Sequence, residues 1–243
     1  MRHHELSPAR TAAALVLAAG LAIPAGLDAQ RTERFTVSGA QVAVYNLAGQ
    51  VRVEAGTGSE VVVEVTRGGG DAGDLRIERG ERDGFRSLAV VYGDDRVVYP
   101  RMGRGTNTEL TVRDDGSFGG GILGGRRVRL TGRGAGMQAW ADLRVLVPAG
   151  RTVSIHQAVG EVEVANVRGD VRVRSSSAPI RAHGTRGPLN LDTGSGGIEV
   201  RDVDEPSPRA NQAVVAVAAS SLNRGECTAL RSAVDGWRPG WDL

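Results

Sequence analysis

The side chains beyond residue 30 that are best suited to acid–base or metal chemistry are two histidines, His156 and His183. Both directly follow an apolar position of an alternating pattern, so both should point outward from a strand. They stand 27 residues apart. A metal centre needs three or four ligands, and no third ligand shares their register. We therefore expect outward, solvated histidines and no metal site.

Carboxylate pairs and glycine-rich runs are the other candidates for a reactive site. Asp94-Asp95 and Asp114-Asp115 fit turns, since neither has the spacing of a calcium-binding loop. The glycine-rich run after Thr193 lacks the first glycine of a nucleophile elbow. A late group of acids alternates with Arg181 and Arg201, as on a salt-bridged surface: Asp192, Glu199, Asp202 and Asp204. We therefore predict that the protein is not an enzyme and carries no cofactor.

The composition excludes further classes of function. All 30 basic residues are arginine, so there is no lysine for a Schiff base or a phosphate-binding loop. The 28 acidic residues are interleaved with the arginines, and no cationic cluster of the kind that binds nucleic acid is visible. The 35 glycines indicate many tight turns between short strands. We expect no nucleic-acid partner.

Residues 1–29 have the pattern of a secretory signal peptide. Basic residues precede an apolar stretch from Thr11 to Gly26, and Ala29 provides a small residue before the cut. An uncleaved N-terminal anchor is the alternative. No later stretch is long and apolar enough to span a membrane. The leader predicts export to the periplasm, the cell surface or the extracellular space.

A nine-residue register carries the prediction of the fold. From Val153 onward, two apolar columns lie two residues apart, which places both side chains on one face of a strand. The first column is Val153, Val162, Val171, Ile180, Leu189 and Ile198, and the second is Ile155, Val164, Val173, Ala182, Leu191 and Val200. A third column of small residues allows the turns: Gly160, Gly169, Ala178, Gly187 and Gly196. The pattern predicts an all-β chain of short strands and tight corners.

The same unit recurs near the start, where Val42–Gly49 matches Val162–Gly169 position by position. Such repeats favour a right-handed parallel β-solenoid, in which stacked rungs bury a continuous core. Two units per rung would make Glu163, Arg181 and Glu199 neighbours of alternating sign. Three units per rung, a period of 27 residues, is the alternative.

The register loosens in the middle and stops after Asp202. We expect an irregular middle section, with a hairpin joining Leu88–Tyr92 to the apolar residues after Asp95, inside one domain of residues 30–205. The tail, residues 206–243, contains the single cysteine, Cys227. It fits a cap, a disordered extension or the product of a frameshift.

Three passages occur in an order that resembles a family of exported bacterial adhesin-like proteins, the β-strand-repeat domains of unknown function that are similar to head-domain adhesins. They are VAVYNLAGQVRVEAG, ADLRVLVPAGRTVSI and LDTGSGGIEV, and the resemblance covers Phe35 to Val203. It implies a right-handed β-solenoid-like fold in the cell envelope and brings no catalytic residues with it.

These observations predict a non-catalytic, adhesin-like envelope protein that binds a polysaccharide or a protein partner through a solenoid face. The candidate contact residues are Arg172, Arg174, Arg181, His183 and Arg201. An accessory or sensory protein of envelope stress signalling and a β-helix polysaccharide-degrading enzyme are the alternatives. The oligomeric state is left open.

Overall fold

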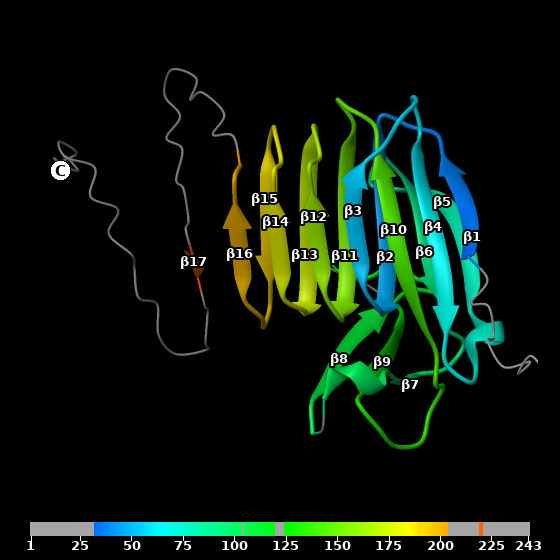
Figure 1. Ribbon diagram of the computed structural model, residues 1–243. Coiled ribbons are helices and arrows are strands. Elements are labelled where there is room, and N and C mark those ends of the chain that lie inside the picture. Colours follow the sequence, from blue (N-terminus) through cyan, green and yellow to red (C-terminus); the bar gives the residue numbers. More distant parts are fainter. Residues whose placement is uncertain (1–31, 104, 120–123, 204–218, 221–243) are drawn as a thin grey trace, which may run out of the picture.

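The computed structural model describes residues 32–103, 105–119, 124–203 and 219–220, which form almost only β-structure (Figure 1). The predicted signal peptide and most of the tail, Cys227 included, lie outside the described residues. The strands are β1 (Thr32–Val37), β2 (Gln41–Ala48), β3 (Val51–Ala55), β4 (Val61–Gly68), β5 (Arg76–Arg82), β6 (Phe85–Val91), β7 (Arg96–Val98), β8 (Asn107–Val112), β9 (Arg126–Thr131), β10 (Trp140–Val147), β11 (Thr152–Val159), β12 (Val162–Ala165), β13 (Asp170–Ser177), β14 (Ile180–His183), β15 (Leu189–Thr193), β16 (Ile198–Arg201) and β17 (Ala219–Ser220). Two 3-10 turns are η1 (Ala72–Asp74) and η2 (Pro100–Met102).

Two large sheets pack face to face over a shared apolar core (Figure 1). The eight-stranded sheet has the order β1-β4-β10-β3-β12-β14-β16-β17, and the six-stranded sheet has the order β15-β13-β11-β2-β6-β5. A third sheet, β7-β9-β8, lies below the ends of the long strands in Figure 1. No helix in the described ranges is long and apolar enough to cross a membrane.

The apolar columns read from the sequence form the core between the two large sheets. Val153 and Ile155 of β11 and Val162 and Val164 of β12 are fully buried. The outward residues between them are more exposed, as the period of two requires. The columns stay buried through Ala182, and the apolar residues of the last two units, β15 and β16, are only half-buried. Strand β15 is the edge of its sheet, and β16 pairs beyond β14 with the two-residue β17.

Strand pairing settles the number of units per rung. Val153 pairs in parallel with Val171, and Val162 pairs in parallel with Ile180, so each step along a sheet is 18 residues. Consecutive nine-residue units therefore alternate between the two sheets, two to a rung. The predicted neighbours Glu163, Arg181 and Glu199 follow one another on β12, β14 and β16.

The early copy of the unit forms a rung of its own next to β11 and β12. Val42 pairs with Val153, and Val51 pairs with Val162, both in parallel. The sequence match equated Val42–Gly49 with Val162–Gly169, but the structure places these two segments in different sheets. The reason is that an apolar pair two residues apart suits either sheet equally well.

The prediction of an all-β fold is confirmed, whereas the sheets are mixed and open rather than uniformly parallel. Strands β1, β4 and β10 pair antiparallel, and so do β5 and β6. A right-handed parallel solenoid for the whole domain is therefore not confirmed. The long segment between the two repeat blocks returns through β10, which adds antiparallel pairing at one end of the stack.

The expected hairpin in the middle section is wrong. Strand β6 pairs with β2 and β5, whereas β7 pairs with β9 in the small sheet. The hairpin that does form joins β5 to β6 through Asp83-Gly84, both with positive φ. Two such residues give the primed turn that suits the twist of adjacent strands.

A column of polar side chains stacks inside one corner of the rungs. Asn46, Gln157, Ser175 and Thr193 are register partners on four neighbouring strands. The Asn46 amide donates to the carbonyls of Ala48 and Ala141, at 3.1 and 2.8 Å. Gln157 Nε2 donates to the Gly49 carbonyl at 2.8 Å. At the tight corner, backbone carbonyls cannot form the hydrogen bonds between strands, and the two side-chain amides donate hydrogen bonds to them instead.

The corner also leaves no space for side chains at the residues that make it. A Cβ on Gly160, whose φ is +119°, would lie 1.7 Å from the Gly49 carbonyl oxygen. The hydroxyl of the buried Tyr92 donates to Asn46 Oδ1 at 2.9 Å. The glycine backbone, the Asn46 amide and the Tyr92 hydroxyl are therefore in close contact where the rung of β2 and β3 meets the rung of β11 and β12.

We expect Gln157→Leu to lower the free energy of unfolding by about 1–3 kcal/mol, because buried carbonyls lose their donor. Urea unfolding followed by circular dichroism measures it. Ser175→Ala is the matched control, because the Ser175 hydroxyl has no hydrogen-bond partner among the residues described. An equal loss in both variants would contradict the role assigned to the Gln157 amide.

Candidate binding groove on the six-stranded sheet

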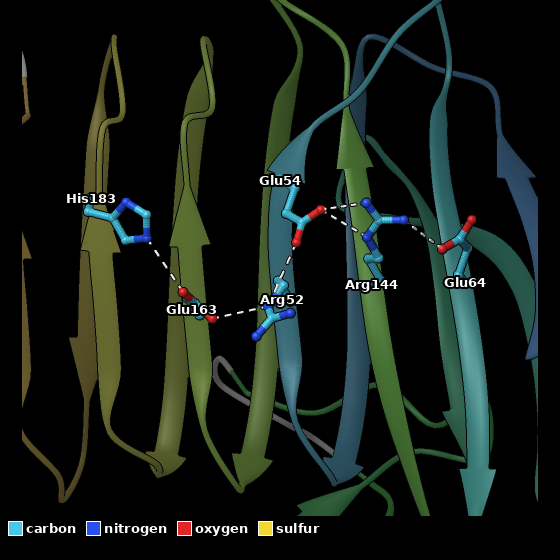
Figure 2. A network of polar contacts seen from close by, with 6 residues as sticks. All are labelled: Arg52, Glu54, Glu64, Arg144, Glu163 and His183. Carbon is cyan, nitrogen blue, oxygen red and sulfur yellow. Dashed lines mark hydrogen bonds and ion pairs between the residues drawn. The ribbon is translucent and has the colours of Figure 1, made fainter. Parts of the chain in front are cut away.

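The outer face of the eight-stranded sheet carries many oppositely charged side chains that form ion pairs. Figure 2 shows six of its side chains linked across β4, β10, β3, β12 and β14: Glu64, Arg144, Glu54, Arg52, Glu163 and His183. Arg144 lies 3.2 Å from Glu64 and 2.7 Å from Glu54. Such exposed pairs contribute little to stability, because solvent screens their charges. Together they leave this face with its charges locally neutralised.

Three of the five predicted contact residues lie on this paired face. His183 Nε2 is 3.4 Å from Glu163 Oε1, and Arg181 is paired with Glu161 and Glu199. Arg201 is also paired with Glu199. The two remaining residues, Arg172 and Arg174, lie on β13 in the other sheet and point outward on the opposite face.

The five residues therefore do not form one surface. The physical reason is the 18-residue rung, since residues nine apart in the repeat belong to different sheets. The same rule separates the two histidines, because His156 is on β11 of the six-stranded sheet. The described residues contain no group of three His, Cys, Asp or Glu side chains that could hold a metal ion.

The outer face of the six-stranded sheet carries a groove of about 970 Å³. Strands β2, β11 and β13 form its floor, and the β5–β6 hairpin and residues 113–119, here called the covering segment, contribute to its walls. The floor residues are Ala43, Tyr45, Ser154, His156, Arg172 and Arg174. Each floor strand is paired on both sides, which makes the floor rigid.

An aromatic cluster attaches the covering segment to the sheet. The rings of Tyr45 and His156, register partners on β2 and β11, stack with centroids 4.4 Å apart and planes 18° apart. Phe118 meets Tyr45 edge-on at 5.9 Å and His156 at 6.4 Å. These are favoured aromatic geometries, and they bury Phe118 against the strands.

An ion pair holds the same segment to the β5–β6 hairpin. Asp115 pairs with Arg82 and accepts hydrogen bonds from the amide and hydroxyl of Ser117, at 3.0 and 2.6 Å. Partial burial raises the pKa of Asp115, but the Ser117 and Arg82 contacts outweigh it and the pKa ends below its ordinary value. The carboxylate is therefore charged at neutral pH and joins the two walls.

His156 is covered rather than solvated, so that part of the expectation is wrong. Burial, with the nearby Arg174 guanidinium, lowers the pKa of His156 from 6.5 to about 4, and Asp83 opposes the change only in part. The imidazole is therefore neutral at pH 7. Its Nε2 lies 3.0 Å from Ser154 Oγ. The covering Phe118 arrives from a loop far away in the sequence, which is why the strand pattern suggested exposure.

Sequence reasoning missed Tyr45 and Phe118, the rings that shape the groove. Tyr45 had a usable signal, since it is an aromatic residue at an outward position, in a chain with only 4% aromatics. Phe118 lies in a loop and carried no such signal. Arg82 and Arg113 were likewise missed, because a hairpin and a loop bring them to the groove.

We expect the stability of the fold to fall as the pH falls from about 6.5 to about 4. The unfolded chain then binds a proton at His156 that the folded chain excludes, at a cost of up to about 3 kcal/mol. His156→Phe should remove this part of the pH dependence. Urea unfolding at pH 7 and pH 4.5 measures it, with His183→Phe on the opposite face as control. A wild-type pH dependence in His156→Phe would exclude His156 as the source.

Comparison with known proteins finds no matching family model and no matching curated protein. Among solved structures, the comparison finds a weak match to a crystal structure described as a "putative cell adhesion protein" from Clostridium sporogenes ATCC 15579. That chain is 8% identical, the TM-score is 0.34, and the match covers 71% of this chain and 99% of that chain. At these values the likeness assigns neither a family nor a function, and the resemblance to adhesin-like proteins remains a prediction.

Proposed function

We propose that this chain is an exported, non-catalytic, adhesin-like binding module of the cell envelope, which holds a polysaccharide or a protein segment in the groove of the six-stranded sheet. The observation that carries the proposal is the groove itself, which has a volume of about 970 Å³. Each of its floor strands, β2, β11 and β13, is hydrogen-bonded to a neighbouring strand on both sides. Ligand sites are typically concave and largely preformed. The leader pattern of residues 1–29 supports export.

The walls support a preformed site. The Arg82–Asp115 pair and the Phe118 cluster hold the hairpin and the covering segment in place without a ligand. A site that is already ordered avoids part of the entropy cost of binding. We also propose that β2–β3 and β11–β16 form a right-handed solenoid. In this part of the chain β13 and β15 follow β11 in parallel at steps of 18 residues, and they extend the sheet that carries the groove.

Among the described residues, the Ser154–His156 contact is a feature that a hydrolytic enzyme would share. A serine nucleophile also needs its histidine oriented by a third group. In the described part of the chain, no hydrogen bond joins the His156 ring to a carboxylate acceptor. The pair is better explained as polar floor, which favours binding over turnover.

We expect the secreted form, residues 30–243, to co-pellet saturably with purified envelope polysaccharide or peptidoglycan. Asn190→Trp, an exposed position lining the groove, should fill it and weaken binding at least tenfold. Ala165→Trp, on the outer face of β12 in register with Glu54 and His183, is the matched control and should bind like wild type. Equal binding by both variants and wild type would exclude the groove as the site.

A further inference from the structure

The groove contains more positive than negative charge. Four arginines line it, Arg82, Arg113, Arg172 and Arg174, against two aspartates, Asp83 and Asp170. Two of the arginines are held by carboxylates, since Arg82 pairs with Asp115 and Arg172 lies 2.7 Å from Asp170. The other two have no such partner, which distinguishes this face from the opposite one.

Arg174 is the clearest case. It is exposed on β13 between two register partners, the neutral His156 and Asp192. Within the described ranges its guanidinium forms no hydrogen bond or ion pair, with Asp192 or with any other residue. On the opposite face Arg52, Arg144, Arg181 and Arg201 all have glutamate partners: Glu163, Glu54, Glu199 and Glu161 among them. Arg174 therefore presents unused donors to the groove.

Arg113 supplies a second cation from the wall. Its only described side-chain contact is a hydrogen bond from Nη1 to Ser117 Oγ at 3.2 Å, a neutral acceptor. It acts electrostatically on Tyr45, as Arg174 does on His156. The two arginines thus flank the stacked Tyr45–His156 pair. A planar guanidinium binds carboxylates in bidentate geometry, so the arrangement favours a ligand with more than one acidic group.

The rest of the groove favours a glycan over a peptide. Strands β2, β11 and β13 of the floor are paired on both sides and offer no free edge for an extended peptide to join. Among the described residues, the edge strand that lines the groove is β15, through Leu189 and Asn190. The polar floor and rim, with Ser154 and Asn190, offer side-chain hydrogen bonds rather than deep apolar pockets. Strands about 4.8 Å apart repeat this chemistry along the groove, which suits a repetitive polymer.

We infer that the groove binds a carboxylate-bearing polysaccharide, with Arg174 and Arg113 as the contacts to its acidic groups. The inference rests on the proposed binding function and narrows its ligand class. His156, neutral and covered, belongs to the floor and adds no charge to the contact.

Titration calorimetry of residues 30–243 with polygalacturonate at 150 mM NaCl tests the inference, with uncharged dextran and poly-glutamate of matched length as comparison probes. We expect saturable binding of polygalacturonate only. Arg174→Gln should weaken it at least fivefold, and Arg174→Gln with Arg113→Gln at least twentyfold. Arg181→Gln, which removes one positive charge from the opposite face, should leave binding unchanged. Circular dichroism confirms that each variant is folded.

The outcomes separate the ligand class from the binding function. If dextran bound as tightly as polygalacturonate and Asn190→Trp lost this binding, the inferred preference for an anionic ligand would be wrong. The groove would still be supported as the binding site. Equal or tighter binding of poly-glutamate would overturn the glycan in favour of an acidic polypeptide. Equal weakening by Arg181→Gln would reduce the effect to nonspecific charge attraction. Failure of every probe, and of envelope polysaccharide and peptidoglycan in the pelleting assay, would count against the proposed function itself.

Discussion

The architecture depends on one tight corner that carries the chain from sheet to sheet. There the backbone turns too sharply for its carbonyls to stay in the ladders, and the amides of Asn46 and Gln157 bind them instead. Because Gly49 and Gly160 stack within this corner, the rungs approach so closely that a Cβ on Gly160 would meet the Gly49 carbonyl. An apolar side chain at Gln157 would leave buried acceptors without donors. This contact holds the rung of β2 and β3 closely against the rung of β11 and β12.

The 18-residue step then gives the two outer faces different character. Units nine residues apart point to opposite sides, so an evenly interleaved sequence of charges is divided between two surfaces. On the eight-stranded sheet the register sets Arg52, Glu163, Arg181 and Glu199 in a row of alternating sign, and the charges pair. On the six-stranded sheet one outward row runs through Tyr45, His156, Arg174 and Asp192, and within the described residues no ion pair joins its members.

The groove exists because segments outside the repeat pack on that second face. The covering segment places Phe118 over Tyr45 and His156, and the Arg82–Asp115 pair connects it to the β5–β6 hairpin. Desolvation under this cover keeps His156 neutral, while its register partner Arg174 is exposed. A rigid floor with uncompensated arginines and few apolar pockets is suited to recognition of an acidic polymer.

The sequence by itself determined the strand content, the inward columns from Val153 to Ala182 and the alternating charges of Glu163, Arg181 and Glu199, since these depend on local alternation and on a fixed period. It also indicated the leader. Only the tertiary structure decided that a rung holds two units, that Val42 stacks on Val153, and that Arg172 and Arg174 lie opposite Arg181, His183 and Arg201. An apolar pair fits either sheet, and a residue's outward direction does not say what will cover it. The cover on His156 comes from Phe118, a contact between segments that no local pattern relates.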